Sequence, residues 1–245
     1  MAMKKNAVEL LDKQLSLRAK KNQYGIVVMS SATDPYVHLE KEYELTRHLL
    51  EVIYKYRFPL HVITKSDLVL RDLDILKKIE ETAILPTGLQ DKLRHRVFVT
   101  FSFSTIDEKI ASIFEPGAPS PALRLETLRS VREAGFASGV SMMPLLPYIS
   151  DTTEQLEKIF QAIQQAKANY VFPSTLTLYG DGRADSKTLV LRAVEKHYSE
   201  LLEKYKRLFA TNLGLPRYYT EAFARKAKEL SLKYGLKNTL MELEN

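Results

Sequence analysis

Polar side chains follow the strand-like segments of this sequence at the points where the segments end. They are Ser30, Ser31, Thr33 and Asp34; Thr64, Lys65 and Ser66; Ser102, Ser104 and Thr105; and Thr177, Tyr179 and Asp181. Because the carboxyl ends of parallel strands meet at one edge of a sheet, we expect these side chains to gather there. Hydroxyl groups beside one lysine suit a small polar ligand that carries a carboxylate.

Each of these residues also has a purely structural interpretation. Ser, Thr and Asp are common turn formers and helix caps. Lys65 is the strongest candidate, because a lysine at a buried strand end is costly unless it meets an anion. Its ammonium group could instead reach solvent at the rim of the sheet. The five histidines show no pair at metal-ligand spacing, and no phosphate-binding glycine loop or HExxH motif occurs, so no metal site is predicted.

The elements that must position these residues alternate between strands and helices. Short apolar runs predict strands at 24–31, 58–64, 96–104, 137–145 and 170–179. Apolar residues at helical spacing predict helices at 7–20, 40–56, 72–83, 120–134 and 152–168. Repeated strand–helix alternation predicts an α/β fold with about five parallel strands and right-handed crossovers.

The pattern changes after Gly182. Segments 186–210 and 220–234 are predicted to be helical, with no strand between them. We therefore expect a β/α barrel-like domain over residues 1–182 and a helical extension, residues 183–245, packed on it. The first predicted element is a helix, whereas a barrel-type chain normally begins with a strand, so we expect that a first strand is missing.

Composition narrows the function classes. The chain has 245 residues, no cysteine and a net charge of +6, with an isoelectric point near 9.2. No run approaches the roughly 20 apolar residues of a membrane span, and no secretory signal is recognisable, so we expect a cytoplasmic protein without a membrane partner. Because the net charge is positive, nucleic acid is a candidate partner.

Five motifs together carry a family resemblance. They are TDPYVHLEKEYELTR (33–47), HVITKSDLVLRDLDIL (61–76), VTFSFST (99–105), EPGAPSPALRLETLRSVREAG (115–135) and PLLPYISD (144–151). In this order, over about residues 5 to 180, the chain resembles the radical S-adenosylmethionine (radical SAM) superfamily, in the branch similar to spore photoproduct lyase. The resemblance implies a partial TIM-like (β/α)6 barrel lacking its first strand, with C-terminal helices added.

The resemblance also implies cofactors, namely S-adenosylmethionine (AdoMet) and a 4Fe–4S cluster, which together yield a 5′-deoxyadenosyl radical. The positions that it implies for AdoMet are Ser31, Thr33, Asp34, Lys65, Ser102 and Arg124. The first three correspond to the region of the methionyl amine, and Lys65 and Ser102 to that of the carboxylate. Arg124 either neutralises the carboxylate or is an exposed helix residue.

One departure from the family pattern bears on activity. Three cysteine thiolates of a CxxxCxxC loop hold the cluster in the family, and this chain has no cysteine. We therefore expect a fragment or truncated form of an iron–sulfur enzyme, unable to bind the cluster and inactive by itself. The missing segment would reflect a shortened chain, a start assigned at an internal methionine, or a natural cysteine-free relative.

Two other functions remain open. One is a basic, nucleic-acid-associated binding module without catalysis, since the predicted C-terminal helices carry many basic residues. The other is an aldolase-type barrel that uses Lys65 as a Schiff-base nucleophile. If the first strand is missing, the exposed sheet edge is expected to allow a homodimer. The substrate is not predicted.

Overall fold

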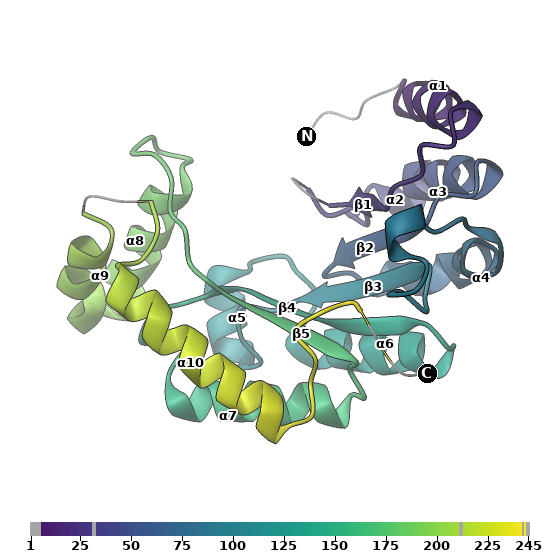
Figure 1. The fold of residues 1–245 in the computed structure, drawn as a ribbon. Coiled ribbons are helices and arrows are strands. Elements are labelled where there is room, and N and C mark those ends of the chain that lie inside the picture. Colours follow the sequence, from purple (N-terminus) through teal and green to yellow (C-terminus); the bar gives the residue numbers. More distant parts are fainter. Residues whose placement is uncertain (1–5, 31–32, 211–212, 242, 244–245) are drawn as a thin grey trace.

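The computed structural model describes residues 6–30, 33–210, 213–241 and 243. Its centre is a sheet of five parallel strands that neighbour one another in sequence order (Figure 1). The strands are β1 Val27–Met29, β2 Leu60–Thr64, β3 Val97–Ser102, β4 Ala137–Leu145 and β5 Tyr170–Thr175. The predicted α/β class with about five parallel strands is confirmed, and the sequential order is consistent with part of a TIM-like barrel.

Helices connect the strands and extend the chain after β5. They are α1 Ala7–Lys20, α2 Glu40–Tyr43, α3 Leu45–Lys55, α4 Leu73–Thr82, α5 Glu108–Phe114, α6 Pro121–Glu133, α7 Thr153–Gln165, α8 Ser186–His197, α9 Leu202–Leu208 and α10 Arg217–Lys233. Among the described helices, none combines the length and the apolar character that crossing a membrane requires.

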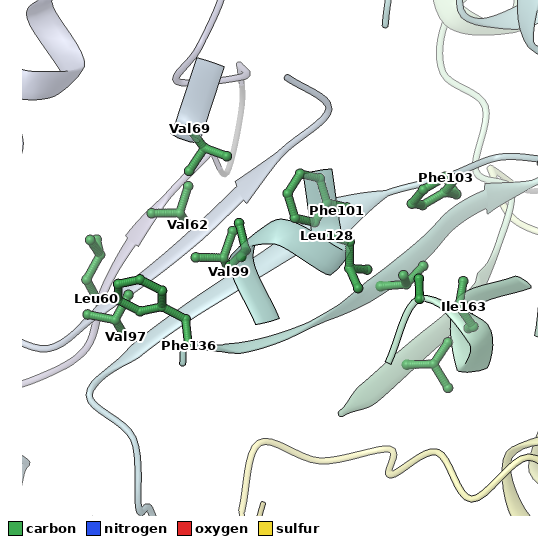
Figure 2. Packing of buried hydrophobic residues seen from close by; sticks show 14 of the residues in the cluster. Leu60, Val62, Val69, Val97, Val99, Phe101, Phe103, Leu128, Phe136 and Ile163 are labelled. Carbon is green, nitrogen blue, oxygen red and sulfur yellow. The ribbon is translucent and has the colours of Figure 1, made fainter. Parts of the chain in front are cut away.

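One face of the sheet carries the main hydrophobic core. Leu60 and Val62 of β2 and Val97 and Val99 of β3 are fully buried there, and Figure 2 shows them on the same side as Leu128 of α6. Residues of α1, α3, α4, α7 and α10 join the same cluster. Because side chains alternate along a strand, the intervening residues point to the opposite face, which we call the inner face.

Local sequence signals explain where two of the helices begin and end. Pro121 lies in the first turn of α6, and the hydroxyl of Ser120 accepts a hydrogen bond from the amide of Leu123 at 3.2 Å. Gly135 follows α6 with φ +92°, a left-handed conformation that glycine adopts readily. Thr152 caps α7 through the amide of Gln155 at 3.3 Å. These features position the loops that precede α6 and α7.

The helix predicted over residues 40–56 is interrupted. Glu44 adopts φ 46°, which ends α2 at Tyr43 and starts α3 at Leu45. The buried carboxylate of Glu40 accepts a hydrogen bond from the amide of Thr46 at 2.8 Å, so a side chain satisfies an amide in the first turn of α3. The helical spacing of apolar residues does not reveal this break, because the break depends on the side chain of Glu40 folding back onto the backbone.

The segment after β5 packs on the rest of the molecule through a second hydrophobic cluster. Val194 of α8 and Tyr205 of α9 are buried there with Leu146 and Leu176, and the hydroxyl of Tyr205 donates to the carbonyl of Pro147 at 2.9 Å. Figure 1 shows α8 and α9 on the opposite side of the molecule from α1, whereas α10 lies beside α7. The division near residue 182 stays a prediction.

The C-terminal tail reaches back to the start of β5. The amide of Val171 donates to the carbonyl of Lys237 at 2.8 Å, and the side-chain amide of Asn238 donates to the carbonyl of Val171 at 2.8 Å. The backbone of β5 is therefore hydrogen-bonded to the tail at this point. Dimerisation through a sheet edge stays a prediction.

Candidate functional site

The structure brings four of the six predicted positions together at the carboxyl edge of the sheet, namely Asp34, Lys65, Ser102 and Arg124. Lys65 directly follows β2, Ser102 ends β3, and Arg124 lies in α6. Arg124 contacts Ser102 directly, and a shared carboxylate links Arg124 to Lys65. Thr33 is exposed in the loop after β1, and Ser31 lies outside the described residues.

Asp34 ties the loop after β1 to the end of β2. Its Oδ1 accepts hydrogen bonds from the hydroxyl of Thr64 at 2.7 Å and from the amide of Tyr36 at 2.9 Å. Its Oδ2 accepts a hydrogen bond from the amide of Lys65 at 2.7 Å. Three neutral donors thus hold this carboxylate, and its clearest contribution is to position Lys65.

The group that links Lys65 and Arg124 is the carboxylate of Glu115. Nζ of Lys65 lies 2.9 Å from Oε1 of Glu115, and Nη2 of Arg124 lies 2.6 Å from Oε2. The exposed fractions of the side chains are 0% for Arg124, 4% for Glu115 and 32% for Lys65. The charge cluster therefore opens to solvent through Lys65.

Arg124 is held on several sides. Its Nη1 donates to the carbonyl of Ser102 at 2.6 Å, and its guanidinium lies 4.8 Å from the ring centroid of Phe103. Its Nε is buried without a hydrogen-bond partner among the described residues. The alternative that Arg124 is an exposed helix residue is wrong, because the side chain faces the end of β3 and is completely enclosed.

The two cations control the protonation of Glu115. Burial alone would raise the pKa of Glu115, but the hydrogen bond and charge of Arg124, together with the charge of Lys65, outweigh burial and hold this pKa below its usual value. Glu115 is therefore ionised at neutral pH. The two cations and one carboxylate give the cluster a net charge of +1. This charge favours the binding of an anion near the ammonium of Lys65.

The same ion pair disfavours Schiff-base chemistry. A Schiff base forms when the lysine nitrogen attacks a carbonyl carbon, whereas Nζ of Lys65 is engaged by the carboxylate of Glu115 at 2.9 Å.

Glu115 is the residue that sequence reasoning missed. It lies in the Pro- and Gly-rich loop between α5 and α6, which on its own is typical of a plain connection. This loop and the two flanking helices line a pocket of about 310 Å³ that Glu108, Ser112, Glu115, Ser120 and Arg124 border. The available signal was the spacing of an acidic residue nine positions before Arg124, which carries little information without the fold.

The residues present fit one of the two implied cofactors. The partly exposed ammonium of Lys65 matches the carboxylate of AdoMet in charge. A 4Fe–4S cluster does not fit, because its family site needs three thiolates and the 245 residues contain no cysteine. Within the described residues, no group of three His, Asp or Glu side chains is placed to hold a metal ion. No reaction step through a cluster is therefore assigned to this chain.

Comparisons with known proteins give relatives that are named as uncharacterized and, among solved structures, fold neighbours with informative names. No family model matches the chain. Uncharacterized protein ORF301 of Acidianus two-tailed virus is 32% identical over 193 residues, which are 74% of this chain and 59% of that protein. Uncharacterized protein Rv2578c of Mycobacterium tuberculosis is 28% identical over 210 residues, which are 86% and 57% of the two chains. The chain thus spans less than three fifths of these relatives.

Among solved structures, spore photoproduct lyase complexed with dinucleoside spore photoproduct matches with a TM-score of 0.60. The match covers 93% of this chain and 64% of that one, at 14% sequence identity. A variant of the same enzyme has been solved with bound AdoMet and matches equally well. At this identity the likeness concerns the fold alone. The chain therefore shares its fold with spore photoproduct lyase.

Proposed function

We propose that this chain is part of a radical SAM enzyme and that it binds AdoMet at the carboxyl edge of the sheet. The observation that carries the proposal is the cluster of Lys65, Glu115 and Arg124 beyond β2 and β3, in a fold shared with an enzyme solved with AdoMet. The reductive cleavage of AdoMet needs a cluster that these residues do not hold. In this proposal the cleavage reaction belongs to a longer parent protein, and this chain by itself does not cleave AdoMet.

Within this proposal, the three residues have different roles. Lys65 touches the ligand, because its ammonium is the one group of the cluster with substantial exposure. Arg124 is a positioning residue, since it is enclosed and its two hydrogen bonds go to Ser102 and Glu115. Glu115 fixes the ammonium of Lys65 and competes with the incoming carboxylate for it.

Isothermal titration of the chain with AdoMet tests the proposal. Lys65→Ala should weaken binding about tenfold or more, because a charge-assisted hydrogen bond contributes about 1.5–3 kcal/mol. Lys77→Ala, which removes an exposed lysine of α4, should leave the dissociation constant unchanged. Absence of saturable binding to the unaltered chain, or an equal loss in both variants, would refute the proposal.

Anaerobic incubation with iron and sulfide tests the part of the proposal that concerns the cluster. We expect no bound iron and no iron–sulfur absorption after desalting. Incorporation of about four irons per chain would show that other ligands serve and would overturn this expectation.

An exposed group of tyrosines favours one second candidate, binding of single-stranded nucleic acid. Tyr148 and Tyr219 pack edge to face with centroids 5.6 Å apart, Tyr218 is 67% exposed, and the ammonium of Lys204 lies 5.2 Å from the Tyr148 ring. Exposed rings beside cations are the groups on which bases stack.

Fluorescence anisotropy with a labelled oligonucleotide tests this candidate. Tyr218→Ala should weaken binding several-fold, since stacking of one base contributes about 1–3 kcal/mol. Tyr43→Ala, at an exposed tyrosine of α2, is the matched control. Binding should fall steeply with added salt. No binding at low salt would eliminate the candidate.

A further inference from the structure

The inner face of the sheet is uncharged and partly open. The register places Val28, His61 and Phe98 in one row across β1 to β3, and Thr100 level with Gly139 and Tyr170 across β3 to β5. Among the registered inner-face positions of the five strands, none is Asp, Glu, Lys or Arg. Leu85, Leu93 and Leu243 cover this face near Phe98, whereas Val28 is 51% exposed.

Three polar side chains form a hydrogen-bonded chain across this face. Nε2 of His61 lies 2.7 Å from the hydroxyl oxygen of Thr100. That oxygen lies 2.8 Å from the hydroxyl oxygen of Tyr170, which donates to the carbonyl of Val99 at 3.3 Å. Thr100 and Tyr170 are fully buried, and His61 is half-buried at the open end of the chain.

All of these bonds form together in only one proton arrangement. Because Tyr170 gives its proton to Val99, Thr100 must donate to Tyr170. Because Thr100 has a single proton, His61 must then donate from Nε2 to Thr100. Burial lowers the pKa of His61 to about 4, so the imidazole is neutral at pH 7 and its Nδ1 carries no proton.

The hydrogen-bonded series requires a glycine at position 139. A Cβ at Gly139 would lie 2.4 Å from the ring atom Cδ2 and from the carbonyl oxygen of Tyr170, so the tyrosine needs glycine beside it. Satisfied polar groups of this kind can often be replaced by apolar ones of the same shape with little loss of stability. The consequence of these hydrogen bonds is that the imidazole of His61 has a fixed orientation. No hydrogen bond to Nδ1 of His61 is present in the described part of the protein.

We propose that Nδ1 of His61 is a hydrogen-bond acceptor in a binding site on the inner face, which takes an uncharged ligand group bearing an N–H or O–H donor. The lack of Asp, Glu, Lys and Arg at the registered positions and the exposed Val28 beside His61 select an uncharged group with apolar surface. The proposal does not require that the chain bind AdoMet.

The first test is the tautomer of His61, measured by nitrogen-15 NMR of histidine-labelled protein, with the resonances of His61 assigned from His61→Gln. We expect the Nε2–H form at pH 7 in the unaltered chain. Tyr170→Phe removes the acceptor of Thr100 and should release part of the population to the Nδ1–H form. A dominant Nδ1–H form in the unaltered chain would overturn the proposal.

The second test uses two small lactams as probes. Titration with 2-pyridone, which is planar, uncharged and carries an N–H, should shift the Nδ1 resonance saturably. The matched probe 1-methyl-2-pyridone lacks the donor and should bind about tenfold more weakly. With binding followed in the variants by backbone amide shifts, His61→Phe should remove the difference between the probes, whereas His38→Phe, at an exposed histidine, should keep it. Equal affinities for the two lactams, or no shift up to the solubility limit, would contradict the proposal.

Discussion

At the residue scale, the candidate site depends on a charge cluster that is only partly exposed. Arg124 is completely enclosed, and Glu115 nearly so, which makes each a costly group to bury unless the other is present. The carbonyl of Ser102 accepts a further hydrogen bond from the guanidinium, and the ring of Phe103 packs against it. Lys65 differs, because it can exchange Glu115 for an external anion without burying a new charge.

This difference predicts unequal effects on stability. Glu115→Gln should lower the free energy of unfolding by about 2–4 kcal/mol, because it leaves the buried guanidinium of Arg124 without a counter-charge. Lys65→Met should cost about 1 kcal/mol or less, since a partly exposed ion pair contributes little. Urea denaturation measures both, with Glu126→Gln on the exposed side of α6 as the control. A larger loss for Lys65→Met than for Glu115→Gln would contradict the burial argument.

The depressed pKa of His61 predicts a pH dependence of stability. The folded chain holds this imidazole neutral down to about pH 4, whereas an unperturbed histidine takes up its proton near pH 6.5. The free energy of unfolding should therefore fall, by as much as about 3 kcal/mol, as the pH decreases from about 6.5 to about 4.

The variant His61→Gln isolates this contribution. It should flatten the pH dependence in that window, measured by urea denaturation at several pH values, and His48→Gln, at an exposed histidine, should not. Glu115 acts in the same direction at lower pH, because its folded pKa is depressed and its contribution is lost only as the pH falls below about 4.5. An identical slope in the His61 variant and the unaltered chain would refute the assignment.

The sequence predicted part of the site because Lys65 and Ser102 follow or end strands, and strand ends meet in space. The pairing of Arg124 with Glu115 was not predictable in this way. It depends on how the loop between α5 and α6 returns to the end of β3, which local patterns do not encode. The role of Asp34 as a ligand group stays a prediction, and its hydrogen bonds to Thr64 and Lys65 join the loop after β1 to the end of β2.

At the scale of elements, the strands were predictable because each is a short apolar run between turn residues. β4 matches its predicted range of 137–145, while β1 and β5 are shorter than predicted. The helix α5 was missed, since its seven residues hold too few turns for a periodic pattern. Its start depends on the carboxylate of Asp107, which accepts hydrogen bonds from the amides of Lys109 and Ile110 at 2.9 and 3.0 Å.

The contact between β4 and β5 gives a prediction for a single glycine. Gly139→Ala places a methyl group against the backbone and ring of Tyr170, which cannot move without disturbing the pairing of the two strands. We expect a loss of about 2–3 kcal/mol in the free energy of unfolding.

Gly88→Ala is the matched control for this substitution. Gly88 has open space where a Cβ would lie, so alanine there should change stability by less than about 0.5 kcal/mol. Comparable losses at Gly88 and Gly139 would show that the close approach of Tyr170 is not the cause.

At the scale of the whole molecule, the chain ends by covering the inner face near the start of the strands. Leu243 is buried against Phe98, Ala137 and Tyr170, far from it in sequence. The tail therefore contributes to the core of the sheet. The helical periodicity of the C-terminal segments predicted α8 and α10, but not this return of the tail, whose described residues pair with β5 through an isolated bridge between Lys237 and Tyr170.

Substitutions in the tail test this contribution. Leu243→Ala should lower the free energy of unfolding by about 2–3 kcal/mol, because it leaves a cavity under β3 to β5. Leu232→Ala, at an exposed leucine of α10, should have little effect. Thermal denaturation followed by circular dichroism measures both. Equal stability of the Leu243 variant and the unaltered chain would show that the tail is dispensable.

The whole molecule shares its fold with a larger enzyme and spans less than three fifths of two similar proteins. The AdoMet binding proposed for this chain is therefore the property to measure first. We would map it by two-dimensional nitrogen-15 NMR of the backbone during titration with AdoMet. We expect the largest saturable shifts at Lys65, Ser102 and Phe103, around the ammonium of Lys65. Shifts confined to other parts of the molecule, or no saturable shift, would contradict a cofactor site at this edge of the sheet.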